Sequence, residues 1–321
     1  MTDTPRILVT RKLPQAVEAR AAETYAATLN PADGAYGPDG LVAAAEGMDG
    51  LLVAPTDRVD AALIGRLPDS VKIVATFSVG YEHIDLEAAR ARGLVVTNTP
   101  DVLTDATADM AVLLMLAAAR RAHEGQTLLR AGKWAGWTPT QLMGIQVTGK
   151  RVGIVGMGRI GQAFAKRARA FDMAVHYYNR RRLDPALEQG AVYHDTVEGL
   201  LPQADFLSLH CPLTAETHHL MNGDRLALLP DGAVLVNTAR GPVVDDDALI
   251  AALASGKLAA AGLDVFQGEP DVDPRYWALD NVFILPHQGS ATVETRNAMG
   301  FRALDNLDAF FAGKEPGDRV A

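Results

Sequence analysis

The sequence predicts an α/β protein made of two doubly wound parallel-sheet domains with a cleft between them. Short apolar runs of strand length alternate with helix-like stretches from the N-terminus to about residue 100. A long helical stretch then interrupts the pattern, and the alternation restarts at Arg151. Alternating strands and helices are typical of parallel sheets covered on both faces. The chain has 321 residues, which is enough for two such domains.

The first domain is predicted to start with a strand and an alanine-rich helix, Gln15–Leu29. Its strands are the short apolar runs Arg6–Thr10, Leu51–Ala54, Ile73–Phe77 and Val95–Asn98. Helical or loop segments separate these runs, and we expect the first part of the domain to end at residue 100.

The second domain is predicted to span residues 101–286. It opens with one helix, Asp101–Arg121, and a loop over 142–150 leads to a longer series of strands. These are Arg151–Val155, Ala174–Tyr178, Phe206–His210, Val234–Asn237, Ala260–Asp264 and Val282–Leu285. Six strands with crossovers make a complete doubly wound domain. The helix Thr292–Phe311 follows a finished domain, so we expect residues 287–321 to return to the first domain and make it discontinuous.

Composition limits the possible partners and compartments. Apolar residues make up 48% and charged residues 21% of the chain, and the net charge is −9. The negative charge argues against nucleic acid or an anionic membrane as a partner. Cys211 is the one cysteine, so no intrachain disulfide can form. The N-terminus lacks the apolar stretch of a secretory signal, and we expect a cytoplasmic protein.

A glycine-rich turn indicates a dinucleotide site. The segment KRVGIVGMGRIG places Gly156, Gly158 and Gly161 in a G-x-G-x-x-G pattern, after a strand and before the helix Ile160–Phe171. The first glycine permits a tight turn, the second a close approach of a pyrophosphate, and the third close packing of helix on strand. The free amides at the helix N-terminus favour negative charge. The alternative is a glycine turn without a ligand.

The end of the next strand indicates which dinucleotide binds. NAD-binding domains usually carry an acid here, which accepts hydrogen bonds from the ribose hydroxyls and repels a 2′-phosphate. This chain has Asn179 instead, followed by Arg180, Arg181 and Arg182. Guanidinium groups of Arg180 and Arg181 are suited to a phosphate. We therefore expect NADPH, with NADH as a weaker cofactor; the alternative is that the arginines form a solvated face.

Further motifs carry a family resemblance. They are LHCPLTAETHHLMN (209–222), VNTARGPVVDDDAL (236–249), GLDVFQGEP (262–270) and LPHQGSATVETR (285–296). Together with VGMGRIG they resemble the D-isomer-specific 2-hydroxyacid dehydrogenase family, from SVGYEHIDL (78–86) to the C-terminal helix. The segments NRR and GKWAGWTP resemble the glyoxylate/hydroxypyruvate reductase branch. The resemblance implies a Rossmann-type cofactor domain, a flavodoxin-like substrate domain and a homodimer.

The resemblance also implies a catalytic set, Arg240, Glu269 and His287. Reduction of a 2-oxo acid needs a hydride and a proton, and a histidine can donate the proton near neutral pH. Glu269 would pair with the other ring nitrogen of His287 and favour its protonated form. Arg240 would bind the substrate carboxylate and polarise the carbonyl. Taken one at a time, each residue also has a structural interpretation.

Other positions follow from the same resemblance. The amides of Val79 and Gly80 would bind the substrate carboxylate. Trp137 would either enter the partner subunit's active site or only anchor the interface. Asp264 would lie near the nicotinamide carboxamide or hold a loop. The remaining positions expected to line the cofactor are Thr107, Met157, Arg159, Ile160, Cys211, Pro212, Thr217, Thr238, Ala239 and Gly289, alongside the glycines and the residues named above.

The sequence thus favours NADPH-dependent reduction of glyoxylate and hydroxypyruvate. An NAD-linked relative acting on 2-ketogluconate or phosphoglycerate is the first alternative, and a non-enzymatic dinucleotide-sensing, corepressor-like protein is the second. Gln288, where relatives often carry an apolar residue, puts the fine substrate preference in doubt. His210, His218 and His219 lack the carboxylate or cysteine spacing of a metal site, so no metal is expected.

Overall fold

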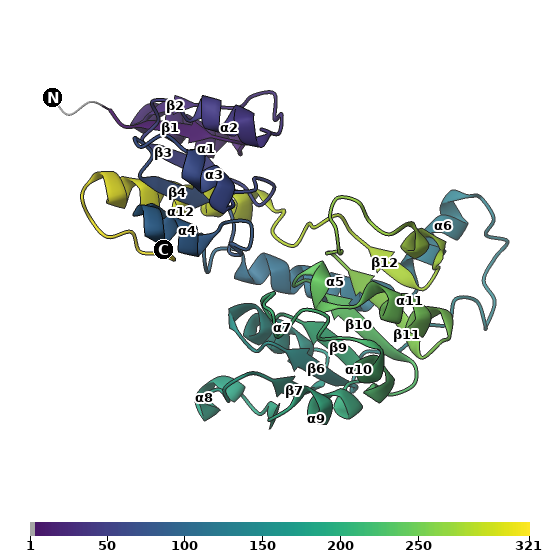
Figure 1. The fold of residues 1–321 in the computed structure, drawn as a ribbon. Coiled ribbons are helices and arrows are strands. Elements are labelled where there is room, and N and C mark those ends of the chain that lie inside the picture. The colour runs from purple at the N-terminus through teal and green to yellow at the C-terminus, as the bar shows by residue number, and fades with distance from the viewer. Residues whose placement is uncertain (1–3) are drawn as a thin grey trace. The chain divides into compact units, whose positions relative to one another are not determined.

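The computed structural model describes residues 4–321 and divides into two compact units (Figure 1). The first runs to Leu103 and resumes over Ser290–Ala321, and the second is Thr104–Gly289. The first unit is therefore discontinuous. The predicted boundaries, after residues 100 and 286, precede these by three residues each.

A five-stranded parallel sheet forms the centre of the first unit. Its order is β2-β1-β3-β4-β5, the order of flavodoxin-like doubly wound domains. The strands are β1 (Arg6–Val9), β2 (Ala26–Thr28), β3 (Gly50–Val53), β4 (Ile73–Thr76) and β5 (Val95–Thr97). Strands β3 and β4 are buried along their whole length, as expected of strands covered on both faces.

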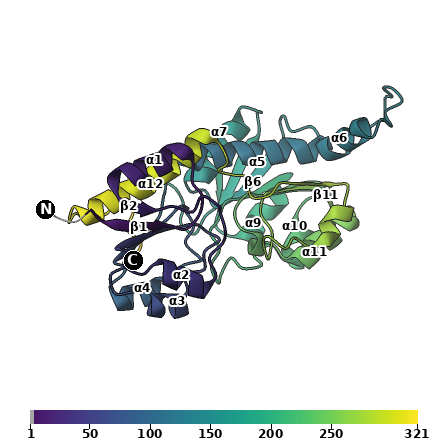
Figure 2. The ribbon, with the colours of Figure 1, turned by 90° about the horizontal axis from the view of Figure 1, so that it is seen from above.

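Helices cover both faces of this sheet. Helices α1 (Gln15–Thr24) and α12 (Val293–Phe311) pack side by side on one face (Figure 2), with Val17, Ala21 and Met299 in their shared core. The other face carries α2 (Pro38–Ala44), α3 (Ala61–Arg66) and α4 (Leu86–Arg92). The return of the last helix therefore completes one face of the first unit.

The predicted helix Gln15–Leu29 is wrong over its last five residues. Helix α1 ends at Thr24, and Tyr25 has the extended angles φ −125° and ψ 159°. Residues Ala26–Thr28 then form the edge strand β2 in register with β1. Alanine favours a helix, but this preference is small. Hydrogen bonding to the edge of β1 outweighs it here, and Ala26–Thr28 form a strand.

A seven-stranded parallel sheet forms the centre of the second unit. Its order, β12-β11-β10-β9-β6-β7-β8, is that of a Rossmann-type domain with one extra strand. The strands are β6 (Arg151–Val155), β7 (Ala174–Tyr178), β8 (Val192–His194), β9 (Phe206–Leu209), β10 (Ala233–Asn237), β11 (Leu258–Leu263) and β12 (Val282–Ile284). Six strands were predicted; the missed one is the three-residue edge strand β8. The strand order reverses between β6 and β9, where such sheets bind their ligands.

The helices of the second unit again lie on two faces. On one face α5 and α7 pack on Val152 and Ile154 of β6, and Phe164 of α7 lies in their shared core. On the other face α9, α10 and α11 pack on Leu207 and Leu235. The helices are α5 (Thr104–Ala119), α6 (Ala122–Arg130), α7 (Arg159–Arg169), α8 (Pro185–Glu188), α9 (Val197–Leu200), α10 (Gly223–Leu228) and α11 (Asp246–Ala254), with 3₁₀ turns η1 (Leu201–Gln203), η2 (Gly241–Val243) and η3 (Pro274–Ala278).

The single helix predicted over Asp101–Arg121 is shorter than expected and is followed by a second one. Helix α5 ends at Ala119, and Arg121 adopts a left-handed conformation, φ 52° and ψ 41°, before α6 begins. Helix α6 and the loop after it extend away from the sheet of their own unit (Figure 2). Within residues 4–321, no helix has both the length and the apolar character needed to cross a membrane.

Candidate active site

The glycine turn has the geometry that the sequence predicts. Gly156 has φ 95°, and a Cβ atom there would lie 2.6 Å from the backbone nitrogen of Cys211. A Cβ at Gly161 would lie 2.3 Å from the carbonyl oxygen of Gly156. Both positions therefore require glycine for packing within the chain.

Gly158 differs from the other two glycines of the turn. A Cβ atom there would meet nothing within 4 Å, so the chain itself does not exclude a side chain. Gly158 is the N-cap of α7 and has no side chain to cap the amides at this helix end. Open space above free amides fits the pyrophosphate of a dinucleotide. The residues present therefore fit a nicotinamide dinucleotide.

The three arginines after β7 have different surroundings. The guanidinium of Arg182 donates to both carboxylate oxygens of Glu188, at 2.7 and 3.0 Å, and lies 5.7 Å from the ring centre of Tyr193. The hydroxyl of Tyr177 also donates to Glu188, at 2.7 Å. The hydrogen bond from Arg182 and, next in size, the one from Tyr177 lower the pKa of Glu188 to about 2. We call Tyr177, Arg182 and Glu188 the clasp.

The clasp separates Arg182 from the two arginines before it. Arg180 and Arg181 are exposed, and neither side chain hydrogen-bonds within residues 4–321. The side-chain nitrogen of Asn179 donates to the carbonyl of Arg181, at 3.2 Å, and so helps to fix the turn. The sequence did not single out Tyr177 or Glu188, since an acid six residues past the arginine in a one-turn helix gives no distinct signal.

Apart from Thr107, which lies in α5, the other predicted cofactor positions are at the carboxyl ends of the strands. Residues 211–217 follow β9, residues 238–240 follow β10, and Asp264 follows β11. Thr217 Oγ1 donates to the carbonyl of Pro212, at 2.6 Å, and Thr238 Oγ1 is buried without a hydrogen-bond partner within the described chain. Their roles toward a cofactor stay predictions.

His287 and Glu269 form a close pair. His287 Nδ1 lies 2.7 Å from Glu269 Oε2, and the side chains are 48% and 32% exposed. The second carboxylate oxygen accepts the backbone N–H of Phe266, at 2.7 Å. Burial alone would raise the pKa of Glu269, but the hydrogen bond and charge of His287 outweigh it and lower the pKa. The carboxylate thus orients Nδ1–H and leaves Nε2 for a substrate.

Arg240 lies on the same side of the sheet, directly after β10. Its Nη1 donates to the carbonyl of Ala239, at 2.7 Å, and its charge contributes to the lowered pKa of Glu269. The strand ends of β10, β11 and β12 therefore bring Arg240, Glu269 and His287 to one edge of one sheet.

Asp264 holds the loop that carries His287. It is 1% exposed, and its two carboxylate oxygens accept the N–H groups of Gln288 and Gly289, both at 2.6 Å. The backbone N–H of His287 donates to the Asp264 carbonyl, at 2.9 Å, and His287 has φ 51°. Burial raises the pKa of Asp264 against the effect of these hydrogen bonds. The geometry favours the loop-holding interpretation of Asp264. Thr107 Oγ1 adds a long contact to the carbonyl of Gly289, at 3.4 Å.

Val79 and Gly80 follow β4 in the first unit and are partly exposed. Trp137 lies in the loop after α6 and is 79% exposed. Within residues 4–321, no group of three or more His, Cys, Asp or Glu side chains suits a metal ion.

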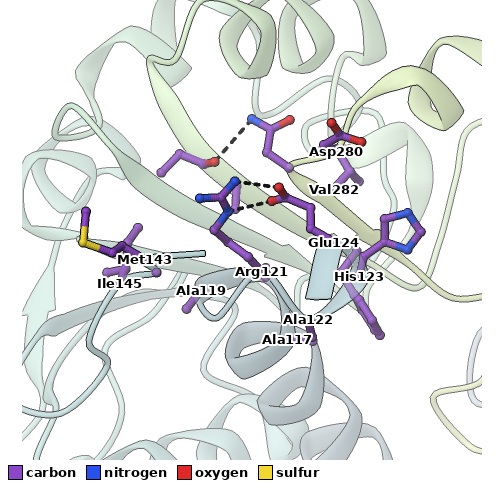
Figure 3. Close-up of a pocket in the computed structure, with 16 residues that line it drawn as sticks. Ala117, Ala119, Arg121, Ala122, His123, Glu124, Met143, Ile145, Asp280 and Val282 are labelled. Carbon is purple, nitrogen blue, oxygen red and sulfur yellow. Dashed lines mark hydrogen bonds and ion pairs between the residues drawn. The ribbon is translucent and has the colours of Figure 1, made fainter. Parts of the chain in front are cut away.

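A separate pocket of about 400 Å³ lies in the second unit, between the end of α5, the start of α6 and the segments that enter β11 and β12 (Figure 3). Arg121 donates to Glu124 at its wall, at 2.6 and 2.7 Å. The pocket includes Ala259, near the amino end of β11, and Asp280, which precedes the amino end of β12. Because His287 follows the carboxyl end of β12, this pocket does not belong to the candidate active site.

Comparisons with known proteins find relatives over nearly the whole chain. Residues 112–289 match the family model described as D-isomer specific 2-hydroxyacid dehydrogenase, NAD binding domain. The chain is 44% identical over 321 residues to a glyoxylate reductase of Thermococcus litoralis, which covers 98% of this chain and 96% of that protein. It is 42% identical over 312 residues to a glycerate dehydrogenase of Hyphomicrobium methylovorum, with 97% of each chain covered.

One solved structure also matches this chain over nearly its whole length. It is the NADPH-dependent glyoxylate/hydroxypyruvate reductase of Sinorhizobium meliloti in complex with NADP and malonate. Its TM-score is 0.89 at 38% sequence identity, and the match covers 99% of this chain and 97% of that one.

Proposed function

Because the chain belongs to the D-isomer-specific 2-hydroxyacid dehydrogenase family, and is therefore an enzyme with a nicotinamide dinucleotide cofactor, we propose that it reduces small 2-oxo acids with NADPH. Glyoxylate and hydroxypyruvate are the first substrates, giving glycolate and D-glycerate. The observation that carries the proposal is the His287–Glu269 pair, 2.7 Å apart at the strand ends of a dinucleotide domain. Relatives named for glyoxylate and glycerate support the substrate class.

The chain's own residues supply the proton. When bound, the cofactor supplies a hydride to the carbonyl carbon. His287 Nε2 donates its proton to the carbonyl oxygen, and the C=O double bond becomes a C–OH single bond. Glu269 stabilises the protonated ring before this transfer and keeps Nδ1 protonated after it. Arg240 binds the carboxylate and polarises the carbonyl, and the amides of Val79 and Gly80 bind the carboxylate as well.

The preference for NADPH rests on the turn after β7. Asn179 carries no negative charge to repel a 2′-phosphate, and Arg180 and Arg181 are exposed beside it. Arg182 is held by Glu188, so two guanidinium groups remain for the phosphate. The double variant Arg180→Ser, Arg181→Ser should lower the ratio of kcat/KM for NADPH over NADH about 30-fold, because charge-assisted hydrogen bonds to phosphate are lost.

The experiment that tests the function is a panel of 2-oxo acids assayed with each cofactor by the loss of reduced-nicotinamide absorbance. Glyoxylate, hydroxypyruvate, 2-ketogluconate and phosphohydroxypyruvate should be compared at equal enzyme concentration. We expect the highest kcat/KM for glyoxylate or hydroxypyruvate with NADPH. A clear preference for NADH overturns the cofactor assignment, and absence of turnover with every acid and both cofactors overturns the enzyme function.

We also propose a homodimer joined through α6 and the loop after it. Large apolar side chains are exposed there: Leu129, Trp134, Trp137 and Met143 at 63, 52, 79 and 66%. Such a patch is typical of an interface, and Trp137 would reach the partner's substrate. Trp137→Ala should weaken the dimer in sedimentation and raise KM for the larger acids. A change in dimerisation with KM unchanged for every acid would exclude the substrate contact.

A further inference from the structure

We propose that Asn98 and Ser78, with Thr76 and His83 behind Ser78, are positioning residues for the substrate carboxylate. They hold the backbone of the segment Val79–Tyr81, called the amide loop below, so that its N–H groups are free to bind an anion. The inference rests on the proposed function, in which amides of this loop bind the carboxylate. It adds the side chains that set their direction.

The amide loop departs from strand geometry directly after β4. The carbonyl of Ser78 accepts the backbone N–H of Thr99, at 2.9 Å. The next carbonyl, that of Val79, accepts the side-chain nitrogen of Asn98, at 2.8 Å. Successive carbonyls of a strand point in opposite directions, whereas here two in a row face the same neighbouring segment, 98–99.

Peptide planarity converts these two contacts into a direction for the amides. In a trans peptide the C=O and the following N–H point in opposite directions. The N–H groups of Val79 and Gly80 therefore both face away from residues 98–99. Neither of them, nor the N–H of Tyr81, donates a hydrogen bond to any residue in the described part of the chain. Unpaired amides on partly exposed residues are suited to an anion.

A third carbonyl is held by a relay of side chains. Ser78 Oγ donates to the carbonyl of Gly80, at 2.6 Å, which turns the N–H of Tyr81 the opposite way. Ser78 Oγ also lies 2.8 Å from Thr76 Oγ1, and Thr76 Oγ1 lies 3.0 Å from His83 Nε2.

Counting protons fixes the direction of this relay. Each hydroxyl has one proton to donate. The proton of Ser78 goes to Gly80, so Thr76 must donate to Ser78, and His83 Nε2–H must donate to Thr76. Each hydrogen bond of the relay, from His83 through Thr76 to Ser78, is therefore directed toward the carbonyl of Gly80.

Burial separates the supporting groups from the binding groups. Thr76, Ser78 and Asn98 are 0, 6 and 8% exposed, whereas Val79 and Gly80 are partly exposed. Buried polar side chains are shielded from water, so removing one leaves its carbonyl partner without a donor. The amide loop would then turn to recover that hydrogen bond, and its N–H groups would lose their direction.

The test measures carboxylate binding apart from hydride transfer. Oxamate, which carries a carboxylate and a carbonyl but accepts no hydride, is titrated calorimetrically into full-length enzyme saturated with NADP⁺. Ser78→Ala and Asn98→Ala should each weaken oxamate binding about tenfold and raise KM for glyoxylate about tenfold, because a small displacement of positioning groups has a large effect. We expect kcat and NADPH affinity to stay within about twofold.

Further variants separate positioning from a general structural role. Ser78→Thr keeps the hydroxyl and should restore oxamate binding, whereas Thr76→Val interrupts the relay further back and should weaken binding about threefold. Ser255→Ala removes a comparable hydroxyl contact, from Ser255 to the carbonyl of Ala252, and should leave both constants unchanged.

The outcomes distinguish the inference from the proposed function. Wild-type enzyme that binds oxamate but reduces no 2-oxo acid argues against the function alone. Folded Ser78→Ala and Asn98→Ala variants that bind oxamate as the wild type does overturn the positioning role. If either alanine variant does not fold, Thr76→Val compared with Thr76→Ser decides, and equal oxamate affinity in the two also overturns it.

Discussion

The loop after β4 in the first unit and the loop after β12 in the second are held in opposite ways. In the first, the side chains of Asn98 and Ser78 donate to carbonyls and direct backbone amides. In the second, backbone amides donate to the buried Asp264 carboxylate, and the loop they fix presents the side chain of His287. One loop offers backbone donors supported by side chains, and the other offers a side chain supported by backbone donors.

This difference determines how each loop responds to mutation. In the proposed function, the group that acts in the second loop is an imidazole, which one substitution removes. The groups proposed to act in the first loop are peptide N–H groups, which remain after any substitution except to proline. Variants of the first loop can therefore misdirect the donors but cannot delete them. Graded losses are expected there, and a near-complete loss is expected in the second.

The largest effect is expected for His287→Ala. Without the imidazole no proton donor stands opposite the carbonyl, and kcat for glyoxylate should fall about 10³-fold. Affinity for NADPH should change little. The measurement is steady-state kinetics beside fluorescence titration with NADPH. As a control, His194→Ala removes the histidine that contacts His176 at the opposite edge of the sheet, and this variant should leave kcat unchanged. Near wild-type turnover of the His287 variant would refute its role.

A smaller effect is expected for Asp264→Asn, which weakens the support of the loop but leaves His287, the proton donor, in place. The asparagine amide presents one acceptor oxygen to two loop N–H groups and turns its own N–H₂ toward the other. We expect kcat/KM to fall about 100-fold through displacement of His287. Asp246→Asn is the matched control, because Asp246 also has a pKa raised by burial but accepts from Tyr276. Equal losses in the two variants would indicate a general loss of stability.

The smallest expected effect is a shift in pH dependence for Glu269→Gln. The pKa of Glu269 is lowered in the folded protein, so the carboxylate is charged over the working pH range and stabilises protonated His287. A neutral amide removes that stabilisation. The basic limb of the kcat/KM profile should therefore move to lower pH, by about one unit. A shift to higher pH would contradict the pairing.

Most residues that form the second loop's arrangement could be predicted from the sequence, whereas few of those that support the first loop could. Glu269 and His287 are predicted as a pair because each stands in a distinctive motif, and the structure places their side chains in contact. The support by Asp264 was one of two interpretations. For the first loop the amides of Val79 and Gly80 were predicted, but Asn98 was not, because a buried asparagine at a strand end has many possible partners.

The strands of the fold also differ in how well the sequence predicts them. Long apolar runs such as Ile73–Phe77 predicted their strands to within one residue, since burial on both faces leaves a strong pattern. The short edge strands Ala26–Thr28 and Val192–His194 were missed. Neither strand contains a fully buried residue, whereas the edge strands β5 and β12, which were predicted, each do. Formation of β2 and β8 therefore depends on pairing with a neighbouring strand, which a local apolar pattern does not reveal.

The clasp has a consequence for engineering the cofactor preference. Three adjacent arginines invite simultaneous randomisation, yet they are not equivalent: Arg182 is bound to Glu188, and Tyr177 extends that contact into the core. A library that varies Arg182 would change its contact with Glu188 together with cofactor recognition. One that varies only Asn179, Arg180 and Arg181 keeps the turn's scaffold constant and explores cofactor recognition alone. The clasp thus marks where the designable part of the loop ends.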